Sequence, residues 1–72
     1  MQLPREVREL VRFASDAVNA YSRGRSIPAV ALHYRYEPVT AITLLQNCCR
    51  WYGRSSVAAV IPRHIFSLID TK

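Results

Sequence analysis

The stretch Pro38–Gly53, PVTAITLLQNCCRWYG, decides the fold of this chain. It is the longest apolar-rich run that has a helix-starting residue at one end and a helix-ending residue at the other. Proline suits the first position of a helix, because its missing N–H has no partner there. Glycine suits the residue just past a helix end, where a left-handed conformation is cheap only without a Cβ. The sequence therefore predicts a central helix over residues 38–52.

This predicted helix is apolar over most of its circumference. Its thin polar stripe consists of Thr43, Asn47 and Arg50 and continues past the helix end to Arg54. A helix of this kind is usually buried on more than one side. We therefore expect the rest of the chain to cover it, with Asn47, Arg50 and Arg54 left to meet a partner.

Two further helices are predicted at the ends of the chain. Residues 4–23 start at a proline and stop before Gly24, and their apolar residues recur every three or four positions, at Val7, Leu10, Val11, Ala14, Ala17, Val18 and Tyr21. The opposite face carries charges four residues apart that can pair, Arg5 with Glu9 and Arg12 with Asp16. Residues 62–70 start at a proline and direct Ile65, Leu68 and Ile69 inward.

Two segments can be interpreted in two ways. Alternation of Val30, Leu32, Tyr34 and Tyr36 favours a strand over 29–36, whereas the Ser-x-Pro start and two alanines favour a helix over 27–35. The run VAAVI at 57–61, which follows a predicted polar link at 54–56, is too short to separate a strand from a helical turn. We predict a mainly α fold, a compact bundle of three to four short helices over about 4–23, 27–35, 38–52 and 62–70. The alternative adds short strands at 29–36 and 57–61.

Size and composition predict one small domain over residues 1–72 that shares apolar surface with another chain. A chain of 72 residues buries only about 60% of the surface that its unfolded form exposes. Half of its residues are nevertheless apolar. We therefore expect a homo-oligomer or a complex with a partner protein.

The chain reads as a soluble cytoplasmic protein. Its only cysteines, Cys48 and Cys49, are adjacent and cannot form a disulfide framework, which favours a reducing compartment. The opening MQLPREVREL lacks an apolar stretch of signal-peptide length. No run reaches the roughly 18–20 apolar residues of a membrane span.

No motif for catalysis, a metal or a cofactor is present in the sequence. Both glycines are explained as helix ends, so no glycine loop remains to bind phosphate. The five acidic residues form no pair suited to acid–base catalysis. The spacing of Cys48, Cys49, His33 and His64 matches no zinc site. We predict a protein that is not an enzyme and has no small-molecule substrate.

The charge of the chain favours an acidic partner. The net charge is +5, and nine of the ten basic residues are arginine, which pairs well with phosphate and carboxylate. Residues 45–63 can be aligned with a helix-turn-helix in which Gly53 makes the turn and Ser55 or Ser56 caps the recognition helix. Pro62 leaves that recognition helix very short. The arginines expected to contact nucleic acid or a partner are Arg5, Arg8, Arg12, Arg23, Arg25, Arg50, Arg54 and Arg63, and we expect Arg23, Arg25, Arg50 and Arg54 to cluster.

Aromatic residues and arginines are also enriched at protein interfaces. The candidate interface residues are Tyr34, Tyr36, Trp51 and Phe66. Two hypotheses follow. The first is a small dimeric DNA-binding transcriptional regulator. The second is an inhibitor or adaptor, of the kind carried by phages and mobile elements, that binds a larger host protein. The expected partner is thus nucleic acid or an acidic protein surface.

Overall fold

The chain folds into helices joined by short links. A computed structural model describes residues 3–70, and within this range no strand is present. The helices are α1 (Arg5–Ser22), α2 (Ile27–Tyr34), α3 (Pro38–Tyr52), α4 (Arg54–Ala58) and α5 (Arg63–Ile69). The mainly α prediction is confirmed. The strand alternatives at 29–36 and 57–61 are wrong, since the first segment is helical and the second contains the end of α4 and a turn.

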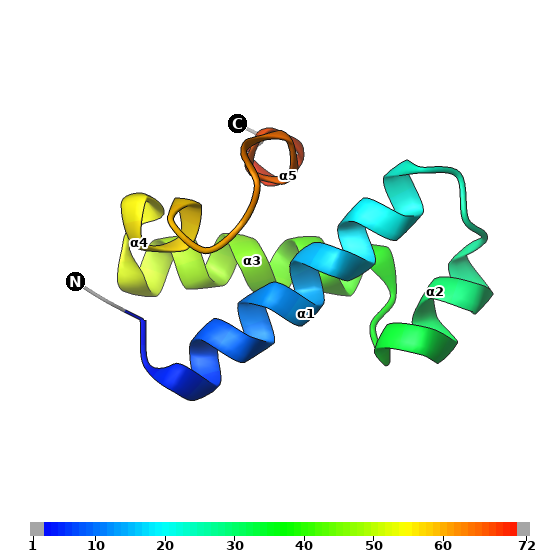
Figure 1. The fold of residues 1–72 in the computed structure, drawn as a ribbon, viewed down its shortest axis with the longest axis horizontal. Coiled ribbons are helices and arrows are strands. Elements are labelled where there is room, and N and C mark those ends of the chain that lie inside the picture. The colour runs from blue at the N-terminus through cyan, green and yellow to red at the C-terminus, as the bar shows by residue number, and fades with distance from the viewer. Residues whose placement is uncertain (1–2, 71–72) are drawn as a thin grey trace.

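The core lies between α1 and α3, which run antiparallel along the length of the molecule (Figure 1). Small residues on α1, such as Ala14 and Ala17, are fully buried and allow the two helices to pack closely. Leu45 is the largest fully buried residue of α3. The predicted 38–52 helix is thus confirmed at both ends and in its central position.

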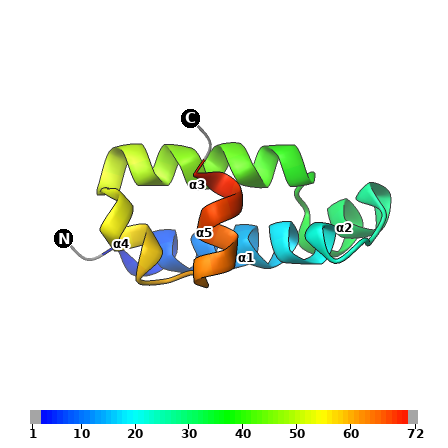
Figure 2. The same cartoon turned by 90° about the horizontal axis from the view of Figure 1, so that it is seen from above.

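α5 lies across α1 and α3 and covers one side of the pair (Figure 2). Ile65 and Ile69, two of the three residues predicted to face inward, are buried. The third, Leu68, is 43% exposed, because α5 meets the core with one narrow face only. Among the residues that the structure describes, no helix is both long enough and apolar enough to cross a membrane.

Both glycines end helices as predicted. Gly24 has φ +90° and Gly53 has φ +94°, a region that other residues rarely adopt. α2 also ends at a residue with positive φ, although no glycine follows it. Its last turn is followed by Arg35, which has φ +61° although it carries a Cβ.

Residues 54–56 are not a polar link, because Gly53 alone separates α3 from α4. The backbone of Gly53 reverses direction with φ +94° and ψ 144°. Ser55 and Ser56 therefore lie within α4 and do not cap it. Val57 is fully buried and attaches α4 to the core.

α3 is buried on more than one side, as expected, since it contacts α1, α4 and α5, but the rest of the chain does not cover it completely. Only Pro38, Ala41, Leu45 and Cys48 are buried, while Val39 is 71% exposed. On α1, Tyr21 belongs to the predicted apolar stripe but is 44% exposed. With only short helices around it, the α1–α3 pair keeps apolar side chains on its surface.

Candidate nucleic-acid interface

The outer face of α1 carries a row of three arginines. Arg5, Arg8 and Arg12 are all exposed and follow one another at steps of three and four residues, which places them on one side of a helix. Arg5 forms the predicted ion pair with Glu9, with 3.7 Å between nitrogen and oxygen. Within residues 3–70, Arg8 and Arg12 have no carboxylate within ion-pairing distance, so the predicted pair with Asp16 is not formed. Two of the three charges are therefore uncompensated.

A cleft of about 450 Å³ lies between this row and α4. We call it the α1–α4 cleft, and its lining residues are Leu3, Arg8, Arg12, Ser55, Ser56, Ala59 and Val60. The burial of Val57 turns the opposite side of α4 outward, which exposes the hydroxyl-bearing Ser55. The cleft thus combines two guanidinium groups with two serines and contains no acidic residue.

The helix-turn-helix alignment fails as a DNA-reading element. α4, which would be the recognition helix, has only five residues, from Arg54 to Ala58. The turn of Gly53 also consists of a single residue, whereas a helix-turn-helix joins its helices by three to four residues. The sequence resembled the motif because both arrangements place a glycine between two apolar runs. Here Gly53 only allows the chain to reverse between α3 and α4.

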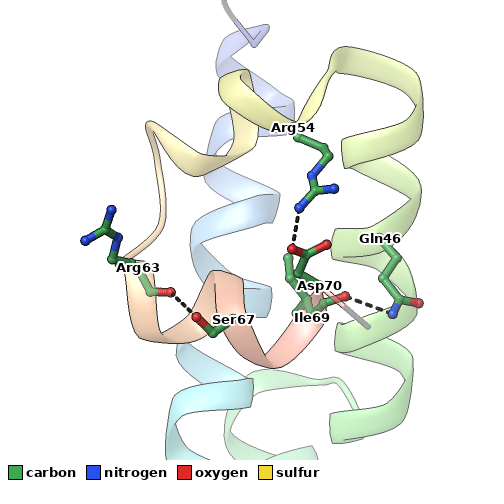
Figure 3. Close-up of polar contacts among 6 residues, drawn as sticks. All are labelled: Gln46, Arg54, Arg63, Ser67, Ile69 and Asp70. Atoms are coloured by element: carbon green, nitrogen blue, oxygen red, sulfur yellow. Dashed lines mark hydrogen bonds and ion pairs between the residues drawn. The ribbon is translucent and has the colours of Figure 1, made fainter. Parts of the chain in front are cut away.

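The predicted contact residue Arg54 is engaged within the molecule. Figure 3 shows its guanidinium directed at Asp70, with which it forms an ion pair. Its central carbon also lies 5.4 Å from the centre of the Phe66 ring, in a cation–π arrangement. Close by, Gln46 donates a hydrogen bond of 3.0 Å to the carbonyl oxygen of Ile69 (Figure 3). These contacts attach the end of α5 to α3 and α4.

The remaining predicted arginines are spread over the surface. Arg50 lines a cavity of about 380 Å³ beside Arg54 and Phe66. Arg63 begins α5, and its guanidinium points away from the neighbouring side chains (Figure 3). The expected cluster of Arg23 and Arg25 with Arg54 is wrong, because the α1–α2 link and the start of α4 lie at opposite ends of the molecule (Figure 1).

The predicted interface aromatics do not share one surface. Trp51 is 68% exposed and borders an apolar groove of about 120 Å³ between α1 and α3, together with the predicted Asn47. Tyr34 and Tyr36 pack partly against the core and line a separate cavity. Phe66 lies under Arg54.

Sequence reasoning missed three surface residues. Ser55 is predicted from the sequence to cap a helix, but in the structure it lines the α1–α4 cleft. Phe13 is 55% exposed and Leu32 is 85% exposed. The exposure of Leu32 could have been predicted. Residues 27–34 have no polar face, so any side of this helix that so small a protein leaves uncovered exposes apolar residues.

The cysteines are free thiols beside the core. Burial raises the pKa of the Cys48 thiol, and the neighbouring Cys49 raises it further. Burial also raises the pKa of Cys49, although Arg54 opposes the shift. Thiols with raised pKa values are poor nucleophiles and poor metal ligands at neutral pH.

The two histidines have separate surroundings. His64 Nε2 lies 3.1 Å from Asn19 Oδ1, and the His33 ring meets Tyr34 edge-on. Within residues 3–70, no group of three or more histidine, cysteine or acidic side chains is placed to hold a metal ion. Comparison with protein-family models, with curated proteins and with solved structures found no match to this chain.

Proposed function

We propose that this chain is a small, non-enzymatic nucleic-acid-binding protein that contacts the phosphate backbone through the α1–α4 cleft. The observation that carries the proposal is the pair Arg8 and Arg12, which are exposed and have no ion-pair partner among residues 3–70. Both line a cleft that two serines also line. Arginine and serine are among the side chains that contact nucleic-acid phosphates. The excess of positive charge over the whole chain would accelerate association with a polyanion.

The expected binding depends little on base sequence. α4 has only five residues and is too short to lie in a major groove and contact several base edges. Binding through phosphates alone positions a protein on the duplex without reading its sequence. A regulatory role would then require sequence selection elsewhere, for example through a dimer that bends the DNA.

Fluorescence anisotropy with a labelled duplex of about 20 base pairs tests the proposal. If Arg8 and Arg12 each contact one phosphate, raising the salt concentration from 50 to 200 mM should weaken binding about tenfold. The double variant Arg8→Gln/Arg12→Gln should lower the slope of log K against log salt by about two.

The matched control is Arg50→Gln/Arg63→Gln, which removes the same charge from two other exposed positions. It should leave most of the binding and most of the slope intact. Absence of binding at 50 mM salt would contradict nucleic-acid binding altogether. Equal losses in the two double variants would show that net charge acts without the α1–α4 cleft.

A second candidate function is protein binding at the groove beside Trp51. An indole that is 68% exposed next to an apolar groove is unusual for a monomer, and tryptophan is enriched at the centres of protein interfaces. The occupant would be a second copy, as in a dimeric regulator, or a larger host protein. Sedimentation at high micromolar concentration tests the first, and capture from a nuclease-treated lysate tests the second. Trp51→Ser should abolish whichever interaction is found.

A further inference from the structure

α2 combines an apolar sequence with an exposed position. Its residues, IPAVALHY, are apolar around nearly the whole helix, and such helices are normally buried. Only Val30 is buried here. Leu32 is 85% exposed and Ile27 is 45% exposed, and Pro28 and Ala29 are exposed beside them. Within the part of the chain that the structure describes, the outward side of α2 therefore remains uncovered.

Arginines surround this exposed helix. Arg23 and Arg25 precede α2, and Arg35 follows it directly, all three on the surface. Among residues 3–70, none of the three forms an ion pair. The sequence between Asp16 and Glu37 contains no carboxylate at all. We call α2 and these three arginines the α2 end, which projects at one extremity of the molecule (Figures 1 and 2).

The charges decide what kind of surface can cover the α2 end. A second copy packed here by two-fold symmetry would bring six arginines together against only the two copies of the exposed Glu37, and like charges in contact oppose association. An anionic surface would be attracted by the same arginines. The apolar residues would then leave water on contact.

The shape and the aromatic residues favour a lipid surface over a protein. α2 is a projecting tip, and insertion into a lipid interface requires no complementary pocket. Tyr21, Tyr34 and Tyr36 lie next to the arginines in sequence, and Tyr21 is 44% exposed. Tyrosine is enriched at membrane–water interfaces, where its ring is apolar and its hydroxyl is hydrated.

We propose that the α2 end docks on an anionic membrane surface, with Leu32 and its exposed neighbour on the same side, Pro28, at the acyl boundary and Arg23, Arg25 and Arg35 at the lipid phosphates. The docking is peripheral, since α2 has only eight residues. This inference is independent of nucleic-acid binding, because the α1–α4 cleft is lined by other arginines. The helix α4, which forms one wall of that cleft, lies at the opposite end of the molecule from α2 (Figure 1).

Vesicle flotation tests the docking. The full chain should float with phosphatidylcholine vesicles that contain about one third phosphatidylserine, and not with phosphatidylcholine alone. Leu32→Ser should lower the partition coefficient at least about tenfold, since it removes the largest inserted side chain. Leu68→Ser is the matched control, because it makes the same change at an exposed leucine of α5 and should leave flotation intact.

Substitution of each of the two sets of arginines in turn distinguishes membrane docking from the proposed nucleic-acid binding. Arg23→Gln/Arg25→Gln/Arg35→Asn should weaken vesicle binding about fivefold per arginine and should weaken duplex binding much less than Arg8→Gln/Arg12→Gln does. Asparagine is chosen at position 35 because it tolerates a positive φ. Arg5→Gln/Arg8→Gln/Arg12→Gln should have the reverse effect.

Three results would overturn the docking proposal. One is the absence of flotation at low salt with anionic vesicles. Another is flotation that Leu32→Ser leaves unchanged. The last is a chain that does not bind vesicles but associates with itself at high concentration, in a way that Leu32→Ser abolishes. That result would assign the α2 end to contact with a second copy. Circular dichroism of each variant confirms that the helices are retained.

Discussion

α1 and α2 both combine apolar residues with three arginines, but they divide them in opposite ways. In α1 the arginines lie along the helix, on the side opposite a buried stripe that includes Val11 and Val18. In α2 the arginines lie outside the helix, at its two ends, and the helix itself has no polar side. α1 therefore buries its apolar face and exposes charge, whereas α2 exposes apolar residues framed by charge.

This difference shows that the placement of charge along the chain decides which surface a helix presents. Charges at helical spacing produce a polar side that water covers, and the other side is free to pack. Charges at the helix ends leave no polar side. A short helix with no polar side exposes apolar residues unless the rest of the chain covers it. The 72 residues of this chain leave α2 largely uncovered.

The largest expected difference between the two helices concerns packing. Val11 on α1 and Val30 on α2 are equally buried, at 0% and 1% exposure. Val11→Ala should lower the free energy of unfolding by about 2 kcal/mol, from lost methyl burial and the cavity left behind. Val30→Ala should cost only about 1 kcal/mol, because the peripheral α2 can move to close its cavity.

Urea denaturation followed by circular dichroism measures both values. Equal costs for the two variants would show that α2 is packed as firmly as α1. The comparison between a structural helix and a contact helix would then fail.

The next difference concerns how the two helices end. α1 is followed by Gly24 and α2 by Arg35, and both residues have positive φ. Gly24→Ala should destabilise the protein by about 1 kcal/mol through backbone strain alone, because an added Cβ would meet no atom within 4 Å. Arg35→Gly should raise stability by up to about 1 kcal/mol, because it relieves the same strain.

Thermal unfolding of the two variants in parallel provides the measurement. A gain of stability together with a loss of vesicle binding in Arg35→Gly would show that the arginine is kept at the cost of stability. A loss of stability in Arg35→Gly would mean that its side chain supports the fold.

The smallest expected effect is at Leu32. Because its side chain is 85% exposed, Leu32→Ala should change the free energy of unfolding by less than about 0.5 kcal/mol. A cost above 1 kcal/mol by urea denaturation would mean that Leu32 packs against the fold in solution, and it would remove the basis for the α2 end as a contact surface.

Local signals in the sequence were sufficient for most of the fold. Proline and glycine at the ends of 38–52 defined α3, and three- and four-residue spacing defined α1. α4 was missed because it depends on the backbone of Gly53 and on the burial of Val57, which the tertiary packing provides. The exposure of Val39 was missed because the sequence does not state how many helices are available to cover α3.

The candidate site was predicted less completely than the fold. Arg8 and Arg12 were among the arginines expected to contact nucleic acid or a partner, and both line the α1–α4 cleft. Their approach to Ser55 depends on the reversal at Gly53 and could not be deduced. Arg54 was misjudged for a related reason, since its partner Asp70 is distant in sequence.

α5 has a mechanical consequence for the whole molecule. Its first turn is joined to α1 through His64 and Asn19, and its end is joined to α3 through Gln46 (Figure 3). Because α5 lies across the two long helices, sliding of α1 along α3 would strain both attachments at once. α5 therefore resists sliding of α1 along α3, because one of its ends is attached to each helix. The position of the arginine row along α3 is restrained in the same way.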